Sequence, residues 1–365
     1  MTMRVFMTTD AVGGVWRYAT TLAARLAADG LTIRLGIVGD PPSLGQAKDV
    51  SAIRGVDLVP LSAPLDWLAG DAEALARGRR AIGKAAEEWR ADVIQLNQPA
   101  YGGAGYSVPV LVASHSCVET WWRSTHGSPT PESWVWHRNA VGEGLKTAKA
   151  VVVPSAAFAA LVEYVYELKK PPIVVHNGIP PRAYLAPKHR QILAAGRAWD
   201  KSKNLVLLNE AAPQIAWPVR LAGALTEPDG AGAMHLPNLT YLGQLGAAAM
   251  AGELAAAPIF VSPSLYEPFG LAVLEAAQAG AALLLSDIPT FRELWDDAAL
   301  FFDPRNRNAL AAQANRLIRD PALVVRQGQA ARKRARRLTI ERTAAEMQAL
   351  YRSLMKSRTG AEALV

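Results

Sequence analysis

Apolar runs of strand length alternate with stretches of helical periodicity along almost the whole chain. The runs in the first half are residues 4–9, 31–39, 56–61, 92–97, 108–114, 150–155 and 172–178. Those in the second half are residues 191–197, 219–225, 238–245, 257–263, 281–287 and 299–304. Because strands that are apolar throughout are buried on both faces, this alternation predicts parallel sheets covered by helices.

An irregular, proline-rich segment, residues 178–190, interrupts the alternation near the middle of the chain. We therefore predict two doubly wound, Rossmann-like α/β domains, residues 1–179 and 180–344, with a last helix in residues 345–365 that packs back on the first domain. Ligands of open parallel sheets bind beyond the carboxyl ends of the strands. Two such domains facing each other predict a site in an interdomain cleft.

The composition is that of a compact globular protein, since 365 residues suffice for two cores, 50% are hydrophobic and 19% are charged. The single cysteine, Cys117, excludes an intrachain disulfide and a cysteine-based zinc cluster. The start of the chain lacks the apolar core of a signal peptide, and no run approaches the roughly 18 apolar residues of a membrane span. We therefore expect a cytoplasmic protein.

The formal net charge of +7 would suit an anionic partner. Much of the excess lies in residues 326–337, whose alanine-rich background is typical of the solvated face of a helix. That interpretation is favoured, and a peripheral contact with a membrane is the alternative. No recognised RNA- or DNA-binding motif accompanies the charge, so we expect no nucleic-acid partner.

The most informative segment for chemistry is "IFVSPSLYEPFGLAVLEAAQAGAALLLSD", residues 259–287. After a buried strand, it predicts a helix that begins near Pro268, with proline at its first position. Backbone amides in the first turn of a helix have no intrahelical partner and attract anions. The amides near Phe269, Gly270 and Leu271 are therefore candidates for binding an anionic ligand.

Two carboxylates flank this predicted anion site. Glu267 precedes the helix, and Glu275 lies about one turn beyond its start. An ionised carboxylate accepts hydrogen bonds from neighbouring sugar hydroxyls, so the pair suits a hydroxyl-rich ligand. The alternative is structural, with Glu267 capping the helix and Glu275 exposed to solvent.

The segment "EPFGLAVLE" resembles the signature, two glutamates separated by seven residues, of retaining glycosyltransferases of the family-four type, which have the GT-B fold. Other motifs of that family occur in the same order along the chain: "GGV" after the first strand, "HNGI" at the domain junction, "AAGRAWDKSKN" and "LTYLGQL". The resemblance implies a hexosyltransferase of carbohydrate biosynthesis. It also implies a nucleotide diphosphate sugar bound by the second domain, an acceptor bound by the first, and no cofactor or metal ion.

The resemblance also assigns roles to single residues of the second domain. Glu267 would bind hydroxyls of the donor sugar, and Glu275 those of the nucleotide ribose. The amides near the helix start would contact the sugar and the diphosphate. Arg197 and Lys203 match a basic pair that neutralises the diphosphate as the glycosidic bond breaks. The segment that holds this pair is one residue longer than usual, so Lys201 competes with Lys203 for the role.

Three residues after the first strand are candidates in the first domain. Gly13 and Gly14 precede a helical pattern, and the resemblance places them against the donor diphosphate or the acceptor. Asp10 lies just upstream. It either receives a proton from an acceptor hydroxyl or caps a turn, and the sequence favours neither.

Further candidates on the acceptor side follow a later strand of the first domain. His115 stands at the carboxyl end of the run 108–114 and matches a histidine that lines the reaction centre in related enzymes, where it would position the donor sugar or the acceptor. Trp121 and Trp122 belong to a tryptophan-rich stretch, residues 120–139. Their rings would contact a sugar, a lipid-linked acceptor or another small molecule, or would pack a helix onto the sheet.

Five alternatives compete with a glycosyltransferase. A sugar epimerase or phosphorylase can share the GT-B fold, although the order of the motifs disfavours both. The chain is alternatively a catalytically silent nucleotide-sugar-binding protein or a module that binds anionic surfaces. A dinucleotide oxidoreductase is disfavoured because the first turn, "TTDAVGGVW", lacks the G-x-G-x-x-G phosphate-binding pattern.

Overall fold

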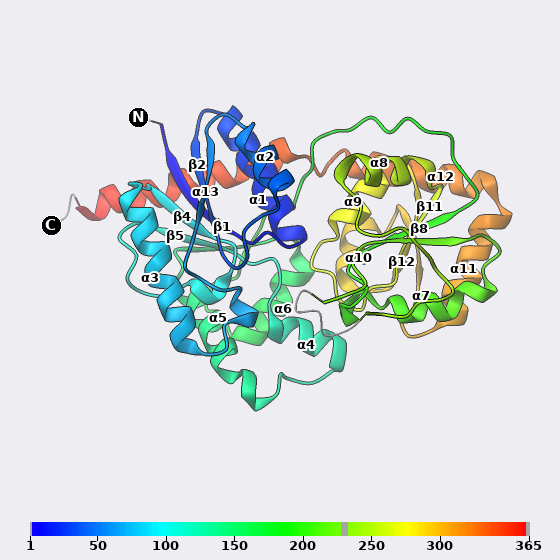
Figure 1. The fold of residues 1–365 in the computed structure, drawn as a ribbon, viewed down its shortest axis with the longest axis horizontal. Helices are drawn as coiled ribbons and strands as arrows, with labels where there is room; N and C mark the ends of the chain where they lie inside the picture. The colour runs from blue at the N-terminus through cyan, green and yellow to red at the C-terminus, as the bar shows by residue number, and fades with distance from the viewer. Residues whose placement is uncertain (1, 228–232, 363–365) are drawn as a thin grey trace. The chain divides into compact units, whose positions relative to one another are not determined.

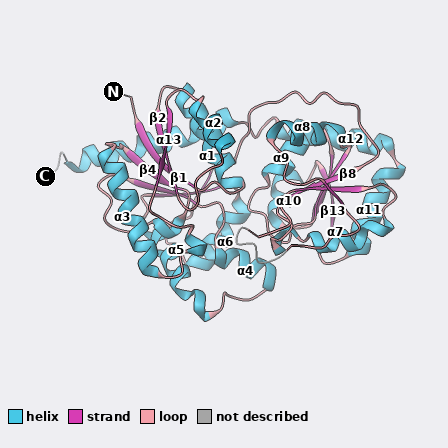
Figure 2. Ribbon diagram, in the orientation of Figure 1, coloured by secondary structure: helices cyan, strands magenta, loops and turns pink. Residues whose placement is uncertain are grey.

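The computed structural model describes residues 2–227 and 233–362, with side chains as far as Lys356. The chain forms two compact units (Figure 1). Unit 1 comprises the residues up to Arg123, Gly127–Gly178 and the residues from Ile340 onward. Unit 2 comprises Ser124–His126 and Ile179–Thr339. Each unit contains one parallel sheet, as the strands in Figure 2 show.

The sheet of unit 1 has seven strands in the order β3-β2-β1-β4-β5-β6-β7, and every neighbouring pair is parallel. Strand order reverses between β1 and β4, which makes the carboxyl ends of these two strands the topological switch point of the sheet. The strands are β1 (Arg4–Thr9), β2 (Thr32–Ile37), β3 (Val56–Pro60), β4 (Val93–Leu96), β5 (Val110–Ala113), β6 (Ala150–Val153) and β7 (Ile173–Val174).

Helices connect these strands, and the C-terminal helix of the chain returns to the same sheet. The α-helices are α1 (Gly14–Ala28), α2 (Leu44–Ser51), α3 (Ala72–Glu88), α4 (Val118–His126), α5 (Val135–Thr147), α6 (Ala156–Tyr166) and α13 (Ile340–Glu362). Three short 3-10 helices are η1 (Asp66–Leu68), η2 (Pro99–Tyr101) and η3 (Glu132–Trp134). None of the described helices is long and apolar enough to cross a membrane.

The alternation of side chains along β1 explains how helices cover both faces of this sheet. Val5 and Met7 point into a core that α1 and α13 complete through Leu22 and Met347. The two helices lie side by side in Figure 1. Phe6, between Val5 and Met7, points to the opposite face, because successive side chains of a strand alternate.

The sheet of unit 2 repeats the same winding. Its six strands have the order β10-β9-β8-β11-β12-β13, again with parallel neighbours, and its switch point lies between β8 and β11. The strands are β8 (Ile192–Ala195), β9 (Val219–Ala222), β10 (Thr240–Tyr241), β11 (Ile259–Ser262), β12 (Ala282–Ser286) and β13 (Ala299–Phe302). The predicted α/β fold with two doubly wound parallel sheets is confirmed.

Both faces of the second sheet are also covered by helices. Leu283 and Leu285 of β12 pack toward α9, α10 and α12, whereas Ala282 and Leu284 pack toward α7 and α11. The α-helices are α7 (Leu205–Ala211), α8 (Ala247–Ala256), α9 (Leu271–Gln278), α10 (Pro289–Trp295), α11 (Arg307–Arg319) and α12 (Pro321–Ala335), and the 3-10 helices are η4 (Lys201–Lys203) and η5 (Ala212–Gln214).

Candidate active site

The switch point of unit 2 brings two of the predicted segments together. Residues 196–204 follow β8 and residues 263–270 follow β11, and these strands are neighbours in the sheet. The backbone N–H of Leu265 donates to the carbonyl oxygen of Ser202 at 2.8 Å. The side-chain amide of Asn204 donates to the carbonyl oxygen of Pro263 at 2.9 Å. The two loops are therefore fixed to each other by backbone as well as side-chain hydrogen bonds.

Asp200 organises the loop that follows β8. Its carboxylate accepts hydrogen bonds from the backbone N–H of Ser202 at 3.0 Å and from the Ser202 hydroxyl at 2.6 Å, and it caps η4. The same carboxylate accepts a hydrogen bond from Arg197 at 2.8 Å. Asp200 is only 5% exposed, so burial and three hydrogen bonds hold it in place.

Lys203 and Glu267 form the central ion pair between the two loops. The Lys203 Nζ donates to Glu267 Oε2 at 2.6 Å, and the two side chains are 20% and 18% exposed. Lys201, the competitor of Lys203 in the sequence, is an exposed residue of the same 3-10 turn. The structure therefore brings Lys203, and not Lys201, into hydrogen-bond contact with a predicted sugar-binding carboxylate.

Arg197 is more open to solvent than Lys203. Its side chain is 41% exposed, ion-paired with Asp200 and placed with its guanidinium 4.9 Å from the ring centroid of Trp199. These contacts on two sides restrict the guanidinium while leaving part of its surface accessible. A restrained and accessible arginine is the arrangement that phosphate recognition requires.

The predicted start of the helix after Glu267 is wrong. Pro268 precedes α9 and is not its first residue, because Gly270 adopts a left-handed conformation, with φ of 90°, and caps a helix that begins at Leu271. A Cβ atom at Gly270 would lie 3.4 Å from Cγ of Glu267 and 3.2 Å from Cε1 of Phe291. The glycine therefore permits a tight turn that places the N-terminus of α9 directly beside Glu267.

This turn changes how the predicted amides are arranged. Leu271 is the first residue of α9, whereas Phe269 and Gly270 belong to the turn that leads into it. Their amides still precede or open the helix, where partial positive charge accumulates. No side chain caps α9 at Gly270. The contacts of these amides with a ligand stay predictions.

Glu275 is buried, with 4% of its surface exposed, in the middle of α9. The alternative that it is an exposed helix residue is therefore wrong. A carboxylate is costly to bury on a helix whose other central residues are apolar, such as Val273 and Leu274. Its placement fits a role in binding, and the contact with a ribose stays a prediction.

The switch point of unit 1 holds Asp10. Its carboxylate, which is 8% exposed, accepts a hydrogen bond from the backbone N–H of Val12 at 2.8 Å and another from the Gln98 amide at 3.1 Å. Gln98 in turn accepts from the Thr8 hydroxyl at 2.8 Å. Asp10 therefore stabilises the turn after β1, and a contact with an acceptor hydroxyl stays a prediction.

Gly13 and Gly14 form the start of α1. Gly13 is its N-cap residue, with φ of 71°, and no side chain caps the helix there. Both glycines are exposed. The positive φ explains the glycine at residue 13, and the exposed N-terminus of a 15-residue helix remains a candidate contact for the diphosphate or the acceptor.

His115 lies two residues beyond the carboxyl end of β5. Its Nε2 is 3.0 Å from Oδ1 of Asn97, and its ring packs against the ring of Tyr18 with 4.3 Å between centroids. Desolvation lowers the pKa of His115 to about 4, so the ring is neutral at physiological pH. A neutral imidazole positions hydroxyl groups and does not supply charge to a phosphate.

The two tryptophans predicted on the acceptor side lie in α4. Trp121 and Trp122 are partly buried, and their rings meet edge to face with 6.1 Å between centroids. Farther along, Trp134 and Trp136 stack on each other and enclose the buried His137. Packing of aromatic side chains is thus established for this segment, and contact with an acceptor stays a prediction.

Three polar residues of these sites were not among the candidates from the sequence: Asn97, Gln98 and Asp200. Asn97 and Gln98 follow directly after β4, and Asp200 caps a turn after β8. The signal that identifies them is their position, because polar residues at the carboxyl ends of strands next to a switch point are expected in ligand sites.

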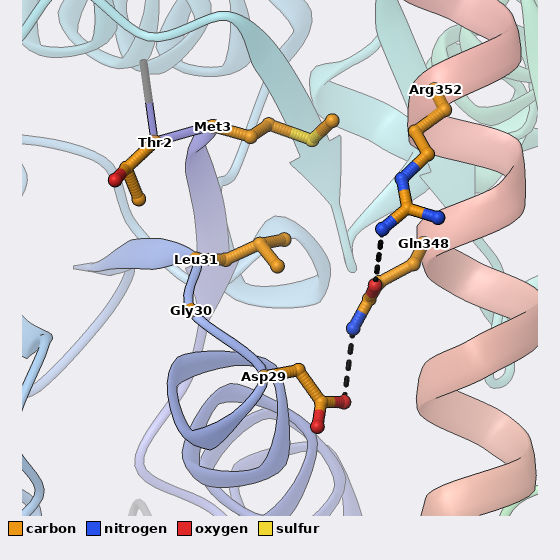
Figure 3. A pocket seen from close by; sticks show the side chains of 7 residues that line it. All are labelled: Thr2, Met3, Asp29, Gly30, Leu31, Gln348 and Arg352. Carbon is orange, nitrogen blue, oxygen red and sulfur yellow. Dashed lines mark hydrogen bonds between the residues drawn. The ribbon is translucent and has the colours of Figure 1, made fainter.

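A separate cavity of about 540 Å³ lies in unit 1 near the amino end of β1, whereas the switch point lies at the carboxyl end of that strand (Figure 3). Gln348 of α13 bridges its two charged side chains, donating to Asp29 at 3.0 Å and accepting from Arg352 at 3.1 Å. Met3 and Leu31 supply the apolar part of the lining. The cavity contains none of the predicted site residues.

Among the described residues, no three His, Cys, Asp or Glu side chains are arranged to hold a metal ion. The basic stretch 326–337 lies mainly in α12. Arg326, Arg332 and Lys333 are exposed on α12, as a solvated helix face requires, and the exposed Arg336 and Arg337 follow its end. A contact of this face with a membrane stays a prediction.

Two parallel doubly wound sheets, each with its own switch point, define the chain as a GT-B-type protein. Solved structures support this fold. Sucrose-phosphate synthase from Thermosynechococcus elongatus matches with a TM-score of 0.80 at 21% identity, over 97% of this chain and 100% of that one. Anabaena HepE, solved with UDP and glucose, matches with a TM-score of 0.74 at 15% identity, over 96% of this chain and 100% of that one.

Family models identify the class within this fold. Residues 12–183 match the model described as Glycosyltransferase Family 4, and residues 189–320 match the model described as Glycosyl transferases group 1. The chain therefore belongs to the glycosyltransferases of the family-four type, as the sequence motifs predict.

Characterised relatives match over shorter segments. Alpha-maltose-1-phosphate synthase of Mycobacterium tuberculosis is 31% identical over 153 residues, which are 39% of this chain and 38% of that protein. Glycogen synthase of the same organism is 38% identical over 96 residues, 26% of this chain and 23% of that protein. The matched segments thus span well under half the length of these relatives.

Proposed function

We propose that the chain transfers a sugar from a nucleotide diphosphate sugar to an acceptor hydroxyl with retention of the anomeric configuration. The observation that carries the proposal is the Lys203–Glu267 ion pair, 2.6 Å long, beside Arg197 at the switch point of unit 2. One cation for the diphosphate and one carboxylate for the sugar are thereby held in direct contact. Family membership supports the class of reaction, and the UDP-glucose bound to HepE is consistent with such a donor.

In the proposed reaction, the bond between the anomeric carbon and the diphosphate oxygen breaks while a bond to the acceptor oxygen forms on the same face. The acceptor proton passes to the departing phosphate. Negative charge therefore grows on the diphosphate, and Arg197, Lys203 and the N-terminus of α9 would stabilise it. Because these groups supply the positive charge, the proposal requires no metal ion.

Glu267 and Glu275 would bind the sugar and the ribose of the donor. Glu267 lies in the turn before α9, whereas Glu275 is buried on the helix itself. The two carboxylates therefore differ in depth, as two sugars of one donor molecule require. On the acceptor side, His115, Asp10 and the pair Trp121 and Trp122 would contact a sugar, a lipid-linked molecule or another small acceptor.

The test is a screen of the purified protein against UDP-, GDP- and ADP-sugars with a mixture of acceptors. Release of nucleoside diphosphate together with a mass increase of one hexose on an acceptor is the expected result, and NMR of the product reports its anomeric configuration. An inverted product would exclude retention. Donor binding without any release would identify a silent nucleotide-sugar-binding protein, and a changed donor without an acceptor would identify an epimerase.

A further inference from the structure

Groups at the carboxyl ends of β1, β4 and β5 form one hydrogen-bond network in unit 1. The side-chain amide nitrogen of Asn97 donates to the carbonyl oxygen of Thr8 at 2.7 Å. The Oδ1 atom of Asn97 accepts from Nε2 of Gln95 at 2.9 Å and lies 3.0 Å from Nε2 of His115. Asn97 is 3% exposed, so water does not compete for these bonds.

The chemistry of this network fixes the tautomer of His115. A backbone carbonyl only accepts hydrogen bonds, so the contact with Thr8 requires that the nitrogen of the Asn97 amide, and not its oxygen, faces β1. The oxygen must then face His115, and it too only accepts. The proton of the imidazole therefore lies on Nε2. A neutral ring with a proton on Nε2 has a lone pair on Nδ1.

The groups around His115 leave its ring uncharged. Tyr18 of α1 packs against it, and burial raises the pKa of that phenol. Burial also raises the pKa of Cys117, which starts α4 two residues later. Asp10 is the nearby carboxylate in the same network, and it is bound to Gln98 and to a backbone amide. Desolvation lowers the pKa of His115 itself to about 4.

We propose that Asn97 is a positioning residue that holds His115 as the Nε2–H tautomer, so that Nδ1 accepts a hydrogen bond from a hydroxyl of the donor sugar or the acceptor. The inference rests on the proposed glycosyl transfer. It adds that, in one contact, the protein accepts the hydrogen bond and the sugar or acceptor donates it. The diphosphate of a nucleotide sugar carries no proton to donate at neutral pH, whereas every sugar hydroxyl does. His115 therefore selects a hydroxyl and disfavours an anion at that position.

The first experiment measures the native protein and uses a variant only to assign its signals. Two-bond proton–nitrogen correlation spectra of the protein labelled with 15N-histidine report the tautomer of each ring, and a His115→Gln variant assigns the His115 signals. We expect a neutral ring with its proton on Nε2 throughout about pH 5.5 to pH 8. A proton on Nδ1, or a charged ring in this range, would overturn the proposal.

The second experiment uses Asn97→Asp, which adds one ionisable group at 3.0 Å from Nε2. Because an imidazole is more basic than a carboxylate, the first proton that the new Asp–His pair takes up goes to the ring, which becomes an imidazolium with a proton on Nδ1. Nδ1 then donates instead of accepting. Proton loss at higher pH restores the acceptor. The variant should therefore lose activity at low pH and recover it as the pH rises.

The matched control is Asn308→Asp, which makes the same change at an exposed residue of α11 that belongs to none of the predicted sites. With the most active donor of the screen, kcat/KM of Asn97→Asp should fall about tenfold or more near the low-pH end of the range used for the spectra, as loss of a buried hydrogen bond predicts. It should recover as the pH is raised. The profiles of the native protein and of Asn308→Asp should lack this step. A loss that is equal at every pH, or no loss, would refute the role of Asn97.

The two experiments separate this inference from the proposed function. If no donor is turned over, the proposed function fails, while the nitrogen spectra still decide the tautomer and its dependence on Asn97. Thermal unfolding of Asn97→Asp shows whether the variant is folded, because the substitution also removes the donor to the Thr8 carbonyl. The spectra of the native protein keep the inference falsifiable if the variant does not fold.

Discussion

Replacement of Lys203 by alanine tests the cation at the centre of the proposed site. The substitution removes an ammonium group that donates to Glu267 at 2.6 Å. Two consequences follow from the geometry. The ion pair is lost as a contribution to folding, and a positive charge is lost where the diphosphate would leave.

The two consequences differ in size. Both side chains of the pair are about one-fifth exposed, at 20% and 18%, so the contribution of the pair to folding is modest. Exposed pairs contribute roughly 0–1 kcal/mol, and partial burial places this one near the upper end of that range. Loss of one group that stabilises a developing anion costs about 2.7–4 kcal/mol, which is about 100- to 1000-fold in kcat. The effect on turnover should therefore exceed the effect on stability.

Lys201→Ala is the matched control, because Lys201 is an exposed lysine of the same 3-10 turn. Initial rates of nucleoside diphosphate release give kcat for both variants, and urea unfolding gives their stability. We expect a large loss of kcat for Lys203→Ala and little change for Lys201→Ala. The double variant Lys203→Ala/Glu267→Gln shows whether the loss arises only because Glu267 has lost its partner. In that case the double variant would be no slower than Glu267→Gln alone.

Two outcomes would refute the reasoning. Near-native kcat in Lys203→Ala would show that the ammonium does not stabilise the leaving diphosphate. An equal loss in Lys201→Ala would show that positive charge on the loop acts at a distance and that the position of Lys203 is irrelevant. That outcome would also give an equally strong salt dependence in the two variants, because charges that interact at a distance are screened.

Three further predictions concern other residues of the two units. Glu275→Gln should weaken binding of the matching nucleoside diphosphate about tenfold, as loss of a charged hydrogen-bond acceptor predicts, and unchanged affinity by calorimetry would exclude a ribose contact. Gly270→Ala should destabilise unit 2 by about 1–3 kcal/mol because its φ of 90° is unfavourable for alanine. Gly246→Ala is its control, since that N-cap glycine has φ of −66° and open space around a Cβ; equal urea midpoints would contradict the strain. The folded pKa of His115, about 4, lies below its unfolded value, so the unfolded state takes up a proton first as the pH falls. The contribution of the His115 ring to the free energy of unfolding is fully present above about pH 6.5. It is lost as the pH falls toward 4, by at most about 3 kcal/mol. His115→Gln should therefore reduce the fall in the free energy of unfolding, measured with urea, as the pH is lowered. An unchanged fall would show that the ring is not buried as a neutral group.

Hydrophobic periodicity predicted the two sheets because each strand is buried on both faces and therefore apolar along its length, as in β1 and β12. It did not predict the start of α9. The preference of proline for the first helical position pointed to Pro268, whereas the left-handed turn at Gly270 depends on close packing against Phe291, a residue of another helix. Local propensity contains no information about such a contact.

The hydrogen-bond network of unit 1 was missed for a different reason. Asn97 is bonded to Thr8, 89 residues earlier, and Gln98 to Asp10, 88 residues earlier. Such partners are brought together by the order of strands in the sheet and not by any local pattern. The family resemblance pointed to His115, and the position just before the glycine pair pointed to Asp10, but neither identified the residues that hold them, since a motif records the residues near a ligand and leaves out their supports.

The two sheets have the same strand order, yet their switch points differ in charge. In unit 2 the loops after β8 and β11 present Arg197 and Lys203, each bound to a carboxylate that limits its motion. In unit 1 the loops after β1, β4 and β5 present a carboxylate, two amides and a neutral imidazole. A diphosphate is stabilised by fixed cations, whereas a hydroxyl that must lose a proton is oriented by hydrogen-bond acceptors. In the proposed reaction, one winding pattern would therefore serve both halves of the transfer, because unit 2 presents cations at its switch point and unit 1 presents hydrogen-bond acceptors.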